Sequence, residues 1–150
     1  MKFIADVMLG RLARWMRFLG FDILYYPDIS DSRLIKIARE QDRFILTRDT
    51  RLIKIKGVKD YLLIKANDSF EQLLEVIEAL KLKQFNLLSR CVRCNGVLTQ
   101  VLKKSEIKDS VPEYVFLNFN VFLKCSSCGN IYWEGSHLKN FREKLGEVLK

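Results

Sequence analysis

Short apolar runs alternate with longer segments of helical periodicity along the first 85 residues. The apolar runs predict strands over residues 2–6, 22–27, 44–47 and 61–65. The segments between and after them predict helices over residues 7–19, 31–41 and 69–82, the first ending at Gly20. Strands and helices that alternate in this way predict the α/β fold class, with a parallel sheet covered on both faces.

The pattern changes after Phe85. Residues 97–102 and 114–123 alternate apolar and polar positions, as the strands of hairpins do. An amphipathic helix is predicted after His137, near the end of the chain. We therefore expect a sheet domain over residues 1–85 and a second, smaller domain with a final helix over residues 86–150.

Composition agrees with a folded chain, because 150 residues with 49% apolar content can bury one core and a small satellite domain. No apolar run approaches the roughly 20 residues that span a bilayer. The chain enters a predicted strand at once instead of a signal peptide. These features lead us to expect a cytoplasmic protein without membrane segments.

The net charge of +8 favours a polyanionic partner, although many basic proteins merely have a well-solvated surface. Residues 1–85 carry 16 Lys and Arg against 12 Asp and Glu, and the remainder carries 10 against 6, an excess of four in each part. Between Arg33 and Lys59 there are nine basic residues against three acidic ones. This local excess suits a phosphate backbone.

Three aspartates follow predicted strands. Asp6 and Asp49 come directly after apolar runs, and Asp31 follows the second strand by a short loop. The carboxyl ends of parallel strands share one sheet edge, where open α/β folds build their sites. Carboxylates gathered there repel one another unless a divalent cation lies between them. Each aspartate also has a simpler interpretation, as the N-cap of a helix or turn.

Arginines lie near these aspartates in the sequence. Helical spacing places Arg11, Arg14 and Arg17 on the face of the first helix opposite its apolar side. That face is either an ordinary solvated surface or a contact for phosphates. Arg48 precedes Asp49 and is either a substrate clamp or a partner of the acidic cluster.

All four cysteines belong to two C-x-x-C motifs, Cys91 with Cys94 and Cys125 with Cys128. Thiolates with this spacing bind a tetrahedral zinc ion, and a glycine soon after each pair permits the tight turn. Free buried cysteines, disulfides and a redox pair are the alternatives. A four-thiolate zinc is structural, because it has no open coordination position. His137, the only histidine, is assigned a structural or capping role in preference to a ligand or general base.

Several of these segments resemble one family, the Mut-seven C-terminal RNase family of PIN-like domains. The resemblance is carried by residues 3–22, 31–38 and 46–49, both cysteine motifs and residues 131–137. It implies a PIN-like Rossmannoid sheet with a carboxyl-terminal zinc ribbon. It also implies a metal-dependent ribonuclease, which we expect to be an endonuclease, with Asp6, Asp31 and Asp49 holding catalytic Mg²⁺ or Mn²⁺.

The resemblance also defines the expected substrate and partners. RNA follows from the resemblance alone, with Arg11, Arg14, Arg17 and Arg48 as the residues expected to bind it. The zinc ribbon is expected to contact RNA or a ribosomal or other ribonucleoprotein component. PIN-like nucleases commonly use four acidic residues, and Asp28 is the nearest candidate for the fourth. The alternatives are a non-catalytic nucleic-acid-binding module and a protein adaptor built on an inactive nuclease fold.

Overall fold

The computed structural model describes residues 1–148 and divides the chain into two compact units, Met1–Asn95 and Gly96–Lys150. The first unit contains a four-stranded parallel sheet in the order β2-β1-β3-β4. Its strands are β1 (Lys2–Ala5), β2 (Asp22–Tyr25), β3 (Phe44–Thr47) and β4 (Tyr61–Leu63). Its helices are α1 (Gly10–Phe18), α2 (Asp31–Glu40) and α3 (Ser69–Ala79), with short 3₁₀ turns η1 (Val7–Leu9) and η2 (Leu52–Lys54). The α/β prediction is confirmed.

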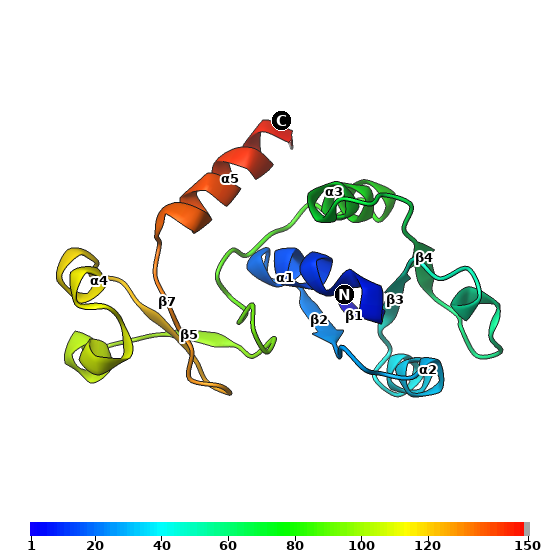
Figure 1. The fold of residues 1–150 in the computed structure, drawn as a ribbon, viewed down its shortest axis with the longest axis horizontal. Helices are drawn as coiled ribbons and strands as arrows, with labels where there is room; N and C mark the ends of the chain where they lie inside the picture. Colours follow the sequence, from blue (N-terminus) through cyan, green and yellow to red (C-terminus); the bar gives the residue numbers. More distant parts are fainter. Residues whose placement is uncertain (149–150) are drawn as a thin grey trace. The chain divides into compact units, whose positions relative to one another are not determined.

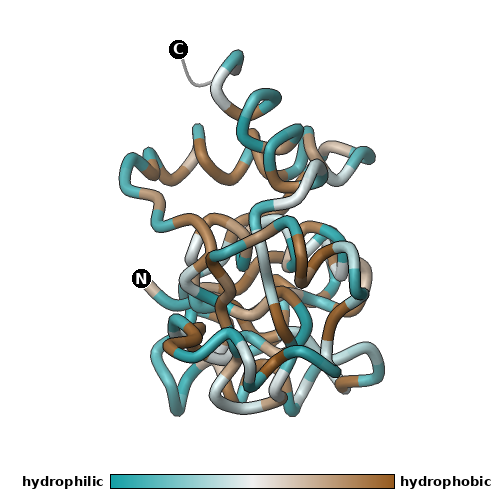
Figure 2. Tube along the Cα trace, turned by 90° about the vertical axis from the view of Figure 1, so that its left-hand side faces the viewer, coloured by the Kyte–Doolittle hydropathy of each residue, from teal (hydrophilic) through white to brown (hydrophobic). Residues whose placement is uncertain are grey.

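The sheet lies between two helical layers. Helices α1 and α3 cover one face, and α2 covers the other (Figure 1). Central strand β1 is buried on both sides, since Phe3, Ile4 and Ala5 are completely inaccessible to solvent. Hydrophobic and hydrophilic residues alternate along the helices (Figure 2), as expected for helices with one face on a sheet. Burial of these apolar faces holds the strand ends in register.

The turn after α1 requires a glycine. Gly20 has φ +92°, a left-handed conformation that terminates the helix, as predicted. A side chain here would also collide with the neighbouring backbone, because a Cβ atom would lie 2.4 Å from the carbonyl oxygen of Asn86. The segment that leads to the first cysteine pair therefore passes closely over the end of α1.

The second unit is a small antiparallel sheet with helices. Its strands β5 (Leu98–Gln100), β6 (Leu123–Cys125) and β7 (Ile131–Tyr132) pair in that order. A 3₁₀ helix η3 (Lys104–Ser110), α4 (Glu113–Asn118) and α5 (Ser136–Val148) complete it. Ile107, Val115 and Phe122 form its own apolar cluster. This unit begins at Gly96, ten residues beyond the boundary expected from sequence, and the first cysteine pair belongs to the sheet unit.

The predicted strand over residues 114–123 is wrong. The first half of this segment forms α4, because the carbonyl of Pro112 accepts hydrogen bonds from the backbone N–H groups of Val115 and Phe116, each at 3.0 Å. Only the last residue of the range, Leu123, belongs to a strand. A short run of apolar residues cannot be assigned to strand or helix by periodicity alone. The proline, with its fixed φ, favours a helix start at this point.

Candidate functional site

Asp6 terminates β1 and is almost completely buried, with 3% of its surface exposed. Its Oδ1 accepts a hydrogen bond of 2.8 Å from the backbone N–H of Val7, so it caps turn η1. Its Oδ2 accepts a hydrogen bond of 2.7 Å from the hydroxyl of Thr47. The capping interpretation therefore holds for Asp6, but it accounts for only one of the two carboxylate oxygens.

Thr47 connects two of the predicted aspartates. It is fully buried at the end of β3, and its hydroxyl accepts a hydrogen bond of 3.0 Å from the backbone N–H of Asp49 while it donates to Asp6. One side chain thus orients acidic residues that follow two adjacent strands. Sequence reasoning missed this residue, although a hydroxyl in an apolar strand two positions before an aspartate was a visible signal.

Asp49 lies beyond the end of β3 and is partly exposed. Its Oδ1 accepts a hydrogen bond of 2.8 Å from the backbone N–H of Arg51, and the Arg51 Nε lies 3.8 Å from the same oxygen. Arg51 itself is 93% exposed, so this ion pair is heavily screened by solvent. The charge of Asp49 is only weakly neutralised within the protein.

Asp31 is exposed at the first position of α2 and does not cap that helix. The cap is Ser30, whose hydroxyl accepts a hydrogen bond from the backbone N–H of Arg33. Within residues 1–148 the Asp31 carboxylate has neither a hydrogen-bond partner nor an ion-pair partner. Partial burial raises its pKa, and the negative charges of Asp6 and Asp49 raise it further, against the opposing charge of Arg51. The three aspartates are therefore close enough to repel one another.

The structure brings these three aspartates to the carboxyl edge of the sheet but leaves them separated. In the part of the chain described, residues 1–148, only the four cysteines are arranged closely enough to form a ready metal-ligand group. The donor chemistry still fits Mg²⁺ or Mn²⁺, which prefer carboxylate oxygens and retain several waters. A cation would also relieve the mutual repulsion. Asp28 is exposed in the loop after β2 and is not among the charges that shift the pKa of Asp31.

A polar cavity of about 400 Å³ opens at the same edge of the sheet. Its walls come from the start of α1, the end of β2 and the start of α3, and include Arg11, Tyr25 and Asn67. The Tyr25 hydroxyl donates a hydrogen bond of 2.8 Å to the carbonyl of Val7, directly after Asp6. This polar hollow therefore begins at Val7, one residue beyond Asp6.

The four arginines predicted near the site differ in their surroundings. Arg11 and Arg14 are exposed on α1. Arg48 donates a hydrogen bond of 2.6 Å to the side-chain oxygen of Asn67, and its buried Nε has no hydrogen-bond partner among residues 1–148. Arg48 therefore holds the loop after β4 in place.

The prediction that Arg17 shares the exposed face of α1 is wrong. Only 5% of its surface is exposed, and its guanidinium donates to the carbonyls of Ile23, Val92 and Arg93 at 3.0–3.3 Å. At about 100° per residue, Arg17 lies roughly 120° around the helix from Arg11, at the border of the apolar face. It holds the first cysteine motif against the sheet domain, so it is not available to a phosphate.

Asp22 lies at the opposite edge of the sheet and has abundant partners. Arg43 donates to it at 2.8 Å, the side-chain amide of Asn95 donates at 2.8 Å, and Arg90 lies 3.8 Å away. Burial alone would raise the pKa of Asp22, but the hydrogen bonds from Arg43 and Asn95 and the charges of Arg43 and Arg90 hold it below its ordinary value. This carboxylate is structural.

The cysteine prediction is confirmed in its geometry. The ligand atoms of Cys91, Cys94, Cys125 and Cys128 lie within 4.8 Å of one another. The backbone N–H groups of Ser127 and Cys128 each donate to the sulfur of Cys125 at 3.4 Å, which stabilises a thiolate. Four clustered thiols suit a closed tetrahedral zinc site. His137 is exposed in the first turn of α5 and is not part of this group.

Glycine makes room for this cluster. A Cβ atom at Gly96 would lie 2.7 Å from the sulfur of Cys125 and 2.9 Å from the hydroxyl of Ser127. Gly129, directly after Cys128, has φ +80°. The glycines after the two cysteine pairs therefore serve different purposes, one a close approach and the other a left-handed turn.

None of the helices described over residues 1–148 has the length and apolar character needed to cross a bilayer. No curated protein and no solved structure matches the sequence. One family model does match, and it covers residues 1–145, almost the whole chain. The fold, the acidic edge and the cysteine cluster thus come together in one protein that belongs to the Mut7-C RNAse domain family.

Proposed function

We propose that this protein is a metal-dependent ribonuclease that hydrolyses RNA phosphodiester bonds at the carboxyl edge of its sheet. The observation that carries the proposal is the convergence of Asp6, Asp31 and Asp49 at that edge, with negative charge that the protein leaves largely unneutralised. The description of the family as an RNAse domain supports RNA as the substrate.

Each part of the edge then has a role. Asp6, Asp31 and Asp49 would hold Mg²⁺ or Mn²⁺, which supplies a water of lowered pKa and positive charge beside the scissile phosphate. Thr47 orients Asp6 and Asp49 through its two hydrogen bonds. The exposed Arg11 would bind flanking phosphate, and Arg14 would extend this contact along α1.

The test is cleavage of labelled RNA by purified protein. Single-stranded and structured RNA, and DNA of the same sequences, are incubated with Mn²⁺, Mg²⁺ or EDTA. RNA should be cut only with a divalent metal, and Asp49→Asn should reduce the rate by about a thousand-fold or more, because it removes a metal ligand.

Asp42→Asn is the matched control, since Asp42 is an exposed aspartate in the turn that leads into β3, at the opposite edge. This variant should cleave at the wild-type rate. Cleavage that survives Asp49→Asn unchanged would place the activity elsewhere or identify a contaminant.

The cysteine cluster is proposed to hold one structural zinc, with the ribbon as a second contact for RNA or for a ribonucleoprotein component. Elemental analysis should find about one zinc per chain. Cys94→Ser should lower that content and unfold the ribbon, because small zinc modules depend on the metal for folding. A disulfide between the two cysteine pairs in freshly purified protein would contradict this.

A second function is favoured by one observation: the aspartates are not a ready ligand group as they stand. The chain would then bind nucleic acid without cutting it, or act as an adaptor between proteins. Tight RNA binding with no cleavage in either metal would support the binding module. Absence of both binding and cleavage would support the adaptor.

A further inference from the structure

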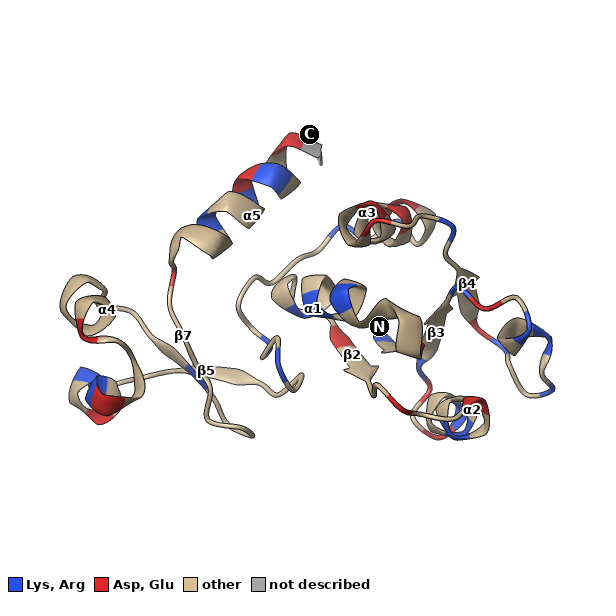
Figure 3. Ribbon diagram, in the orientation of Figure 1, with Lys and Arg blue, Asp and Glu red and all other residues tan. Residues whose placement is uncertain are grey.

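Seven exposed cationic side chains of the sheet domain belong to two segments, α2 and the loop between β3 and β4. Both segments are rich in lysine and arginine, as Figure 3 shows. We call these residues the basic ridge: Arg33, Lys36, Arg39, Arg51, Lys54, Lys56 and Lys59.

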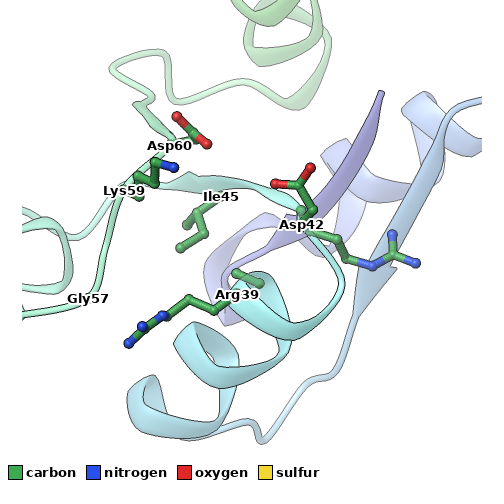
Figure 4. Close-up of a pocket in the computed structure, with 8 residues that line it drawn as sticks. Arg39, Asp42, Ile45, Gly57, Lys59 and Asp60 are labelled. Carbon is green, nitrogen blue, oxygen red and sulfur yellow. The ribbon is translucent and has the colours of Figure 1, made fainter.

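The two segments pack directly against each other, so their charges form one surface. Val58 of the loop packs on the apolar cluster that contains Leu34, Ile35 and Ala38 of α2. Gly57 passes so close to α2 that a Cβ atom would lie 3.3 Å from a guanidinium nitrogen of Arg39. Figure 4 shows Arg39 extending from α2 toward the chain at Gly57, beside a cavity of about 240 Å³.

The acidic residues of these segments lie mainly at the two ends of the surface. Asp31 and Asp49 lie at the carboxyl edge, and Glu40, Asp42 and Asp60 lie near the other edge. Glu40 pairs with Lys36 at 3.9 Å, but both side chains are more than half exposed, so the pair is weak. Among residues 1–148 no ion pair involves Arg33, Arg39, Lys54, Lys56 or Lys59. The middle of the ridge therefore retains its positive charge.

The ridge is continuous with the aspartate site. Arg51, its first loop residue, has its Nε 3.8 Å from Oδ1 of Asp49. From there α2 extends over ten residues, about 15 Å, which corresponds to roughly four phosphates at the spacing of one duplex strand. A strand bound at the aspartates has a cationic surface along which it can extend.

We propose that the basic ridge binds the phosphates of the RNA strand on one side of the cleavage site. This rests on the proposed ribonuclease function. Helix α1 offers fewer cations for the same purpose, because Arg11 and Arg14 are exposed there and Arg17 is buried. The ridge therefore contributes most of the electrostatic binding. Contacts made to phosphates act on all sequences alike.

Binding is measured in the Asp49→Asn background, so that RNA stays intact, by fluorescence anisotropy of labelled single-stranded RNA over a salt series. The ridge variant combines Lys36→Gln, Lys54→Gln and Lys56→Gln. The control combines Lys2→Gln, Lys81→Gln and Lys83→Gln, which removes the same charge from exposed positions outside the ridge. Thermal melts establish that both variants are folded.

The ridge variant should weaken binding by about ten-fold or more at roughly 150 mM salt. Its slope of log affinity against log salt should fall by about two, at about 0.7 for each lost phosphate contact. The control should match its parent in slope. Equal salt slopes for the ridge and control variants would contradict the proposal that the basic ridge binds RNA phosphates. If the wild-type chain still cleaves RNA, the ribonuclease proposal would be unaffected by that result. If the parent binds no RNA and the wild type cuts none, both proposals fail together.

Discussion

Two aspartates at opposite edges of the same sheet have opposite environments. Asp22, at the start of β2, is surrounded by Arg43, Arg90 and Asn95, and its pKa is lowered. Asp31, at the start of α2, has its pKa raised by partial burial and by the negative charges of Asp6 and Asp49. We call the edge at Asp22 the compensated edge, because arginines of the protein neutralise its negative charge. We call the edge at Asp6, Asp31 and Asp49 the uncompensated edge, because its negative charges lie near one another.

This difference separates a structural carboxylate from a candidate functional one. Carboxylates that lie near one another without an internal counter-charge repel, and an external divalent cation would relieve that repulsion. The compensated edge supports the first cysteine motif, and the uncompensated edge is where we place the chemistry.

The largest effect on stability is expected at the compensated edge. Asp22→Ala leaves Arg43, whose side chain is 7% exposed, without its ion-pair partner. Chemical denaturation should show a loss of about 3 kcal/mol in the free energy of unfolding, because a buried cation is left unpaired. Asp28→Ala, an exposed change of the same kind, should have little effect.

The contribution of Asp22 also depends on pH. Because its folded pKa lies below the ordinary value of 3.8, its stabilisation is present above that value and is lost as the pH falls through the folded pKa. An Asp22→Ala protein as stable as the wild type at neutral pH would show that the partners of Asp22 at this edge do not stabilise the fold.

An intermediate effect is expected at Thr47, on activity. Thr47→Val keeps the shape of the side chain but removes the hydroxyl that orients Asp6 and Asp49. Cleavage should fall by about 10–100-fold, and Thr47→Ser should restore most of it. The predicted loss lies in kcat, since the hydroxyl positions metal ligands and does not contact the substrate. A loss confined to KM would contradict this role.

The smallest effect is expected for Asp31→Asn on stability. The raised pKa means that ionisation of Asp31 costs stability as the pH rises through it. At neutral pH and without divalent metal, the variant should therefore melt at a slightly higher temperature than the wild type, and the difference should vanish in acid. A lower melting temperature at neutral pH would mean that Asp31 has a stabilising partner.

Much of the acidic edge was predictable from sequence. Apolar runs that end in aspartate mark the carboxyl ends of buried strands, and parallel topology brings those ends together, so Asp6 and Asp49 were accessible to pattern reasoning. The cysteine pairs were equally clear, since their spacing encodes their geometry. The local sequence pattern was sufficient to predict a site residue wherever the fold class itself determines which residues lie beside it.

The compensated edge was not predictable in this way. Asp22 and Asn95 are 73 positions apart, and nothing in either local sequence indicates that they meet. Arg17 lies at the border of the apolar face of α1, where helical periodicity assigns it to solvent as readily as to the interior. Such partners are determined by tertiary packing, in particular by the path of the chain over Gly20 toward Cys91.

The most direct test of the central claim is the titration of individual aspartate carboxyl groups by NMR, with and without Mg²⁺. Without the metal, Asp31 should titrate above the ordinary value of 3.8 and Asp22 below it. Saturating Mg²⁺ should lower the apparent pKa of Asp31, because the cation competes with protons for the carboxylates, and should leave Asp22 unchanged. An Asp31 titration that Mg²⁺ does not move would contradict a metal site at this edge of the sheet.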